Sequence, residues 1–170
     1  MKLSVDAINE RSPFWVIQLD EMLFRFITRN GIKYRVGFYP DTFFMTEDAY
    51  HFFLERVDEG PAIYDPDVLK VVTIIIEEFF RVGTNVMLYI CDPSDRRQEQ
   101  RSRLYKIWFE SYSNREAFTL ADMTIDFEGQ IVYGGLLIRK NHPAYIEILE
   151  AFNDFVHLVP YVRALSKNKN

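Results

Sequence analysis

The chain has 170 residues, of which 48% are hydrophobic, 26% are charged and 16% are aromatic, with 15 Phe, 10 Tyr and 2 Trp. This length fits one domain, and the composition excludes disordered, collagen-like and coiled-coil classes. The 25 acidic residues outnumber the 20 basic ones and give a net charge of −5, so binding to nucleic acid through bulk charge is not expected.

The compartment and domain organisation follow from simple counts. Cys91 is the sole cysteine, so no intramolecular disulfide can form. The first ten residues lack the apolar core of a signal peptide, and no apolar run approaches the ~20 residues that span a bilayer. We expect a cytoplasmic protein without a membrane span, folded as one domain over residues 1–165 with a polar, basic tail at 166–170.

The first elements predict a small sheet. Phe14 to Leu19 is a short apolar run that fits a strand or one helical turn. Alternating aromatic residues in Met22 to Arg29 and in Ile32 to Tyr39 flank Asn30-Gly31, the pair that favours a type I′ hairpin turn. One face of this hairpin should be buried and the other exposed.

A third strand, a helix and a buried strand come next. Tyr50 to Val57 is the third strand, and Asp65-Pro66 begins a helix because Asp caps free amides and Pro fits the first turn. This helix should end near Gly83. It is apolar on most sides, so we expect it at the centre of the fold, followed by a buried strand at Met87 to Cys91.

The last third of the chain alternates helix, hairpin and helix. Ser94 to Tyr112 predicts an amphipathic helix, and Asp95 with Gln98 has the spacing of a capping box. Two strands should flank Glu128-Gly129, and a last helix should start after Asn141. The whole order predicts an α+β domain, with a mixed, mainly antiparallel sheet and three helices.

The junction after Cys91 holds the candidate binding residues, which are Asp92, Asp95, Arg96, Arg97 and Arg101. A helix start binds anions through its amides and dipole, and arginine forks match phosphate or carboxylate. Helical spacing also places Arg97 and Arg101 with Leu104 and Trp108 on the expected inward stripe. Two readings remain open here: Asp92 or Asp95 pairs with the arginines as part of the scaffold, or the arginines accept a small anionic ligand.

Residues 91–109 fit the pattern CDxxDxRQxxRxRLYxxWF. With the preceding helix and strand, this run resembles an uncharacterised family of small bacterial proteins known only as a domain of unknown function. The likeness covers roughly Tyr34 to Arg139. That family has no assigned activity, so the resemblance marks the segment as characteristic and implies no catalytic role.

A second resemblance concerns architecture. The order β-β-β-α-β-α-β-β-α is similar to the core of the acyl-CoA N-acyltransferases, which implies acetyl-CoA as a cofactor and Tyr105 as a candidate catalytic acid. That superfamily binds pyrophosphate with a glycine-rich loop. Here the corresponding loop, Val57 to Asp67, has one glycine and four carboxylates, which would repel a pyrophosphate.

Other chemistry has weaker support. Cys91 has no neighbouring His or second Cys, and the three solitary histidines lack ligand spacing, so neither a nucleophile nor a metal site is expected. Phe43-Phe44 is the candidate interface pair, because one sheet face cannot hide two adjacent rings. We therefore expect a non-enzymatic module without a cofactor that binds a protein, a second copy or a small anion. The alternative is a diverged acyltransferase-like enzyme.

Overall fold

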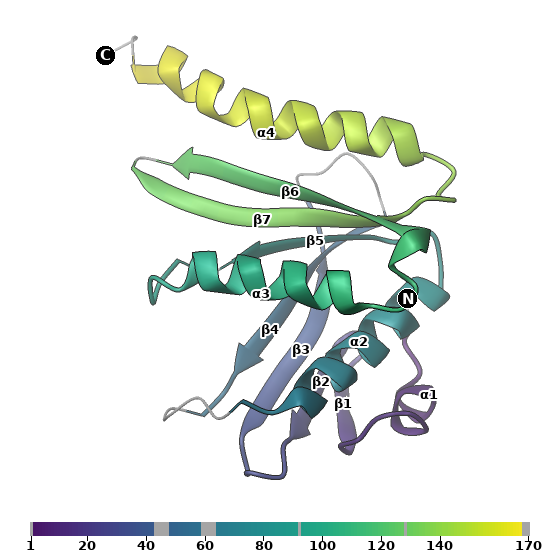
Figure 1. Cartoon of the computed structure of the whole chain (residues 1–170). Helices are drawn as coiled ribbons and strands as arrows, with labels where there is room; N and C mark the ends of the chain where they lie inside the picture. The colour runs from purple at the N-terminus through teal and green to yellow at the C-terminus, as the bar shows by residue number, and fades with distance from the viewer. Residues whose placement is uncertain (1, 43–47, 59–63, 92, 128, 168–170) are drawn as a thin grey trace. The chain divides into compact units, whose positions relative to one another are not determined.

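The computed structural model describes residues 2–42, 48–58, 64–91, 93–127 and 129–167 (Figure 1). The chain divides into two compact units. Unit 1 comprises Met1–Pro40 and Tyr50–Asn85, and unit 2 comprises Asp41–Ala49 and Val86–Asn170. A single domain over residues 1–165 stays a prediction.

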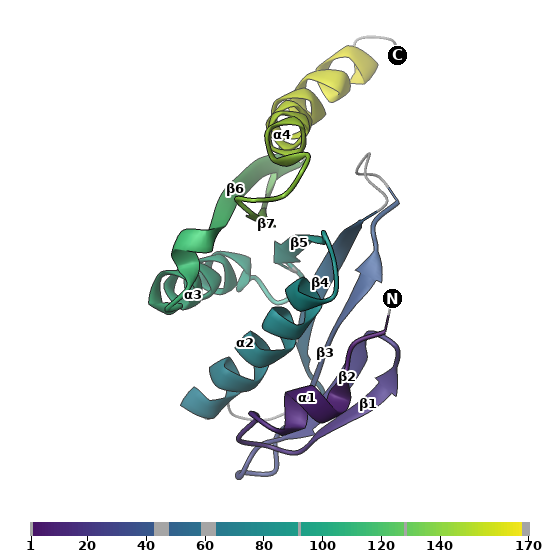
Figure 2. The same cartoon turned by 90° about the vertical axis from the view of Figure 1, so that its right-hand side faces the viewer.

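Unit 1 is built on four antiparallel strands that pair in chain order. They are β1 (Val16–Asp20), β2 (Leu23–Ile27), β3 (Lys33–Pro40) and β4 (Ala49–Arg56). The helices α1 (Val5–Asn9) and α2 (Pro66–Arg81) lie on one face of these strands (Figure 2). Alternation buries every second side chain beneath the helices, as the sequence predicts for the first hairpin. These buried residues are Phe24, Phe26, Val36, Phe38 and Phe52.

The first hairpin is confirmed, but its turn differs from the predicted type. A type I′ turn needs positive φ at two central residues. Gly31 has φ +77°, whereas Asn30 does not lie in the positive region. The amide of Gly31 donates to Thr28 O at 2.9 Å, and the amide of Thr28 donates to Ile32 O at 2.9 Å. The loop between Thr28 and Ile32 is therefore one residue longer than the predicted two-residue turn and needs only one glycine in the left-handed conformation.

Helix α2 forms where the Asp65-Pro66 signal places it. The Asp65 side chain accepts a hydrogen bond from the amide of Asp67 at 3.0 Å, and Pro66 occupies the first turn. Its buried face packs on the strands, and the rings of Phe38 and Phe79 stack with centroids 4.0 Å apart. The prediction of a capped, deeply packed helix is confirmed.

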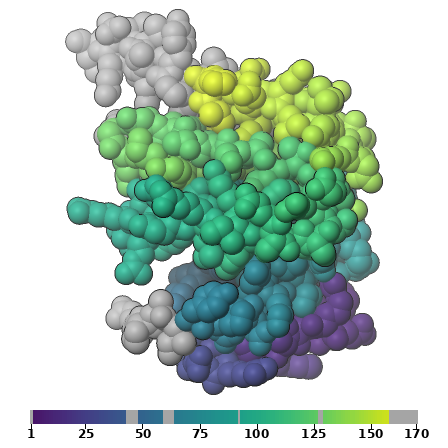
Figure 3. All heavy atoms as spheres, viewed as in Figure 1, coloured from purple at the N-terminus to yellow at the C-terminus, as the bar shows by residue number. Residues whose placement is uncertain are grey.

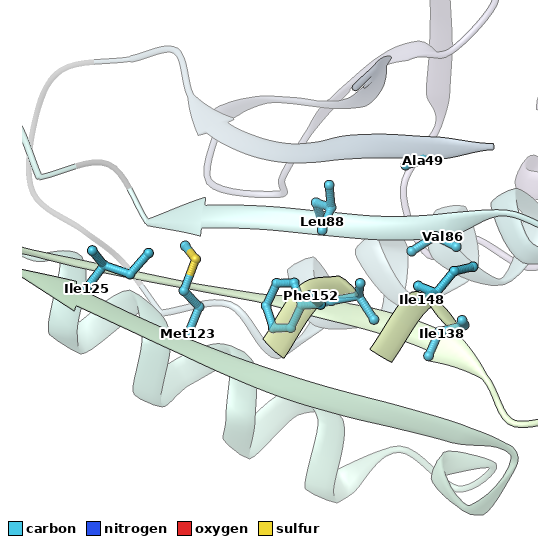
Figure 4. Close-up of a cluster of buried hydrophobic side chains, with 9 residues drawn as sticks. Ala49, Val86, Leu88, Met123, Ile125, Ile138, Ile148 and Phe152 are labelled. Carbon is cyan, nitrogen blue, oxygen red and sulfur yellow. The ribbon is translucent and has the colours of Figure 1, made fainter. Parts of the chain in front are cut away.

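The described residues of unit 2 form three strands and two long helices. The strands β5 (Val86–Cys91), β7 (Gln130–Arg139) and β6 (Phe118–Phe127) pair antiparallel in that order. Helix α4 (Tyr145–Lys167) packs on one face through Ile148 and Phe152 (Figure 4). The opposite face carries α3 (Gln98–Ser111), and a short helix, η1 (Arg115–Ala117), leads into β6.

The α+β class is confirmed, with two departures from the predicted elements. Helix α1 was not expected. Its N-cap is Ser4, whose hydroxyl oxygen accepts a hydrogen bond from the amide of Ala7 at 3.2 Å. Helix α4 continues through Ser166 and Lys167, the first residues of the predicted tail, and residues 168–170 lie outside the described chain.

Candidate functional site

The start of α3 differs from the predicted capping box. The helix begins at Gln98, and Arg97 occupies the N-cap position without a side-chain cap hydrogen bond. A turn precedes it, in which the amide of Arg96 donates to Pro93 O at 3.0 Å and Arg96 takes φ +58°. That left-handed residue interrupts the helical backbone, so the prediction that Asp95 caps a helix from Ser94 is wrong.

Asp95 instead binds an arginine across this turn. Its two carboxylate oxygens accept from Arg101 Nη1 at 2.8 Å and Nη2 at 2.6 Å, and Oδ1 also accepts from the amide of Arg97 at 3.1 Å. The bidentate Arg101 contact, with help from the Arg97 amide, holds the pKa of Asp95 below its usual range. Arg101 thus has the partner that the scaffold reading expects for it.

The remaining candidate cations at this junction point to solvent. Arg96 and Arg97 are both exposed. Asp92, the other predicted acceptor, lies outside the described residues. Each of the two interpretations therefore applies to different arginines. Arg101 forms the structural ion pair with Asp95, while Arg96 and Arg97 remain available at the surface.

The inward stripe of α3 also differs from the predicted one. The buried residue of this helix is Ser102, with Tyr105 beside it, whereas Leu104 is 38% exposed. Ile107 is 59% exposed on the same outer side as Leu104. Helix α3 therefore turns aromatic and small side chains inward and an aliphatic pair outward. Figure 3 shows unit 2 from the side on which α3 lies.

Beneath α3 lies a pair of tyrosines, of which sequence reasoning named Tyr105 as a candidate and missed Tyr89. The ring of Tyr89 on β5 meets Tyr105 edge-on, with centroids 5.3 Å apart. Gly135 makes room for Tyr89, because a Cβ at that position would lie 2.7 Å from the phenol oxygen. The Tyr89 oxygen is buried and has no hydrogen-bond partner among the described residues.

The two tyrosines and Cys91 are neutral near pH 7. Burial raises the pKa of the Cys91 thiol to about 11, and burial likewise raises the pKa of both Tyr89 and Tyr105. A thiol with a raised pKa is a weak nucleophile. Tyr105 can donate a proton or a hydrogen bond but is not placed to act as a base.

An ion pair ties α3 to β6 beside these tyrosines. Lys106 Nζ lies 2.9 Å from Asp122 Oδ2, and both side chains are close to half exposed. Asp122 on β6 is the register partner of Gly135 on β7, so the Lys106–Asp122 ion pair lies next to the glycine that makes room for Tyr89. The sequence pattern gave no signal for this pair, because the two residues come from different elements.

The start of α2 presents carboxylates that are already engaged. Asp65 caps the helix, and Asp67 Oδ1 lies 2.6 Å from Lys70 Nζ. Asp58 Oδ2 accepts from the amide of Lys33 at 2.6 Å. The described part of the predicted loop therefore presents acidic groups where an acyltransferase would present amides, and residues 59–63 lie outside the description.

The other predicted sites add little. Phe43 and Phe44, the candidate interface pair, lie outside the described residues. His142 Nδ1 accepts from the amide of Ala144 at 3.1 Å, which is a local turn contact. Over the described ranges, no group of three His, Cys, Asp or Glu side chains is arranged to hold a metal ion. Nor does any described helix have the length and apolarity to cross a membrane.

Comparison with known proteins identifies similarity at two levels. A model described as "Family of unknown function (DUF6169)" matches residues 64–154, which include α2, β5, α3, β6 and β7. No curated protein matches in sequence. Among solved structures, the fold is similar to that of a CoA-dependent acyl-homoserine lactone synthase, MesI, with a TM-score of 0.37 and 11% identity over 81% of this chain and 73% of that one.

Proposed function

The chain belongs to the DUF6169 family, whose function is unknown. From the geometry of the site, we propose that the protein is a binding module that recognises an acidic protein segment through α3. The observation that carries the proposal is the exposed pair Arg96 and Arg97 at the start of α3. Arg97 holds the N-cap position, but its side chain makes no hydrogen bond to the helix amides. Helix amides and guanidinium groups at one point both favour an anion.

The neighbouring charges support an external partner. Asp95 is the carboxylate closest in sequence to this arginine pair, and Arg101 already binds both of its oxygens. Arg103 Nη2 is paired with Glu99 Oε1 one turn away, at 2.5 Å. The charge at the helix start is therefore not neutralised by these two acids.

An apolar stripe continues from Arg97 along the outer side of α3. Leu104 and Ile107 follow Arg97 at helical spacing, and both are exposed. Interfaces combine arginine with apolar anchors, whereas a free inorganic anion would use only the charged end. The stripe therefore favours a protein segment with acidic and apolar side chains over a small ion.

Display panning tests the proposal. The protein would be panned with a random library of roughly 12-residue peptides, a length that covers the face of a helix of this size. We expect enrichment of peptides that pair acidic with apolar residues. Arg97→Glu should weaken them about 10- to 100-fold, as expected for loss of charge-assisted hydrogen bonds.

The matched control is Lys140→Glu, which makes the same charge change at another exposed residue of unit 2. It should leave binding within about twofold, because an exposed charge away from the contact acts only through screened, long-range terms. Peptides that bind wild type, Arg97→Glu and Lys140→Glu equally would refute the role of α3. Melting temperatures of all three proteins establish that the fold is intact.

A diverged acyl-CoA N-acyltransferase-like activity is the second candidate, favoured by the order β2-β3-β4-α2-β5-α3-β6-β7 and by Tyr105 on α3. It ranks second because Asp65 already caps the start of α2 and Asp67 adds a second carboxylate there. Calorimetry with acetyl-CoA tests it directly. Absence of heat at millimolar ligand rejects this activity, while saturable binding would place it above the binding-module proposal.

A further inference from the structure

The strands of unit 1 have an outer face, opposite α1 and α2, that exposes apolar side chains. Alternation turns these residues away from the buried Phe24 and Phe26. Ile27 is 44% exposed, and Tyr39 is 53% exposed. We call this surface the outer sheet face and define it by Ile17, Arg25, Ile27, Arg35, Tyr39 and Val57. Exposed apolar groups of this extent on one face mark an interaction site.

Two arginines lie directly opposite each other at the centre of the outer sheet face. Arg25 on β2 is the register partner of Arg35 on β3, and Ile17 is the partner of Arg25 on its other side. Glu55 on β4 binds Arg35, with Nη2 at 2.6 Å and Nε at 3.1 Å. Like charges opposite one another destabilise a sheet, and Glu55 binds only one of these two cations, Arg35.

The Arg25 side chain has no acceptor among the described residues. Its Nε is buried, and neither a hydrogen bond nor an ion pair joins this side chain to another described residue. A buried polar atom of a charged group without an acceptor is costly. The centre of the outer sheet face therefore lacks one anion, and the surrounding surface is apolar.

An aromatic ridge borders this centre. Tyr39 stacks on His51 with centroids 5.1 Å apart and lies 6.2 Å from the ring of Phe53. Phe53 lies beside Gly37, where a Cβ would come within 3.3 Å of the Phe53 ring. These rings form a flat apolar border next to Arg35, which suits an extended chain lying across the strands.

We propose that the outer sheet face docks a segment of another protein in which a carboxylate is flanked by apolar side chains. The carboxylate binds Arg25 and completes the Arg25–Arg35–Glu55 row. The apolar side chains cover Ile17 on one side and Tyr39 on the other. All residues of this site belong to unit 1, whereas α3 belongs to unit 2, so the two proposals concern different residues.

The charges on the face select this occupant over two others. A second copy packed face to face would bring the Arg25–Arg35 pair against its own copy, and like charges across an interface cost affinity. Single-stranded nucleic acid needs a basic groove that follows the phosphates. Here Arg35 and Lys33 are already paired with Glu55 and Asp58, which leaves Arg25 as the cation without a partner in the row.

Trp15 provides a reporter next to the site. It is 75% exposed and immediately precedes β1, and the only other tryptophan is Trp108. Trp108→Phe leaves Trp15 as the single emitter. The probes are three synthetic peptides of roughly 12 residues, long enough to span these strands at about 3.3 Å per residue. They repeat Asp-Phe-Glu-Leu, Lys-Phe-Lys-Leu or Asp-Ser-Glu-Gly.

We expect only the acidic, apolar peptide to shift Trp15 emission to shorter wavelength in a saturable way. Arg25→Gln should weaken this binding at least about tenfold, because it removes a charge-assisted contact. Arg29→Gln is the matched control, since Arg29 lies in the hairpin loop, and it should leave binding unchanged. Ile17→Ser should weaken binding without changing the melting temperature.

Any of the following results would overturn the proposal. Failure of the acidic, apolar peptide to bind, or equal binding to Arg25→Gln, removes the role of this face. Tighter binding of poly(U) would assign it to nucleic acid. A concentration-dependent dimer that shifts Trp15 without peptide would assign it to a second copy. Arg97→Glu, which tests α3, should leave the Trp15 response unchanged, so the two proposals fail independently.

Discussion

Helices α2 and α3 both follow a loop that carries acidic residues, yet their starts are built in opposite ways. Asp65 caps α2 with its own carboxylate. At α3, Asp95 lies two residues before the N-cap and binds Arg101, while Arg97 takes the cap position. A carboxylate at a helix start satisfies the amides and repels anions, whereas an arginine there attracts them.

The two helices also differ in how much of them is buried. Helix α2 buries most of one face, including the carboxylate of Glu78, and α3 buries only Ser102. An element with few buried contacts contributes little to stability and is available for binding. Helix α2 is therefore part of the scaffold of unit 1, whereas α3 is the element that we propose for recognition, and four substitutions test this difference.

Glu78→Ala should have the largest effect. Glu78 is 1% exposed, accepts from the amide of Ser4 at 2.9 Å, and binds Arg81 through both oxygens at 2.6 and 2.7 Å. Its loss removes the acceptor of the Ser4 amide and both contacts of the Arg81 guanidinium, so we expect about 2 kcal/mol less free energy of unfolding. Urea denaturation measures this, with Glu77→Ala, a partly exposed ion-pair residue, as the control expected to cost under about 1 kcal/mol.

Stability should also depend on pH through Glu78. The Arg81 hydrogen bond, aided by the Ser4 amide, lowers the pKa of this carboxyl in the folded state. Its contribution is therefore complete above the unfolded pKa of about 4.3 and is lost as pH falls through the lower folded value. The difference between wild type and Glu78→Gln should be constant above about pH 5 and shrink in acid. A difference that grows in acid would contradict the assignment.

Asp65→Ala should have the next largest effect, because it removes the cap of α2. Loss of an N-cap carboxylate costs about 1 kcal/mol. The measurement is the urea midpoint at pH 7, and Asp65→Asn serves as the control because its amide oxygen still accepts from the amide of Asp67. If Asp65→Ala and Asp65→Asn are equally stable, the cap does not hold α2.

The sequence was sufficient for the first hairpin and for α2 because their signals are local. Alternating Phe24 and Phe26 specify the buried face, and Asp65-Pro66 specifies a helix start. The start of α3 could not be predicted from such local signals. Asp95 has the spacing of a cap, but the bidentate contact with Arg101 competes with the helix amides and is stronger than a neutral hydrogen bond.

The inner face of α3 depends on a residue far along the chain. Gly135 on β7 leaves room for the Tyr89 ring, and Tyr89 in turn receives Tyr105. This places Tyr105 inward and Leu104 outward. Periodicity within residues 94–112 contains no information about a gap in another strand. The predicted inward stripe was therefore wrong for Arg97 and Leu104, which are exposed, whereas its other members, Arg101 and Trp108, are partly buried.

Arg101→Ala should destabilise the protein less than Asp65→Ala. The Asp95–Arg101 pair is partly exposed, and such pairs contribute little net stability because water screens them. We expect a small fall in melting temperature, largest above the unfolded pKa of Asp95, because the pair lowers that pKa in the folded state. Arg103→Ala, which breaks a pair within α3, is the control and should change the melting temperature less.

Arg97→Ala should change stability least of all and binding most. Arg97 is exposed and its side chain caps no amide, so we expect the free energy of unfolding to stay within about 0.5 kcal/mol of wild type. The same substitution should weaken acidic peptides selected on α3, since it removes the cation beside the helix amides. Denaturation and peptide titration on one protein separate the two effects. A clear loss of stability together with unchanged binding would contradict the proposal. The start of α3 would then have a structural role, like the start of α2, because the arginine would stabilise the helix itself and would not contact a partner.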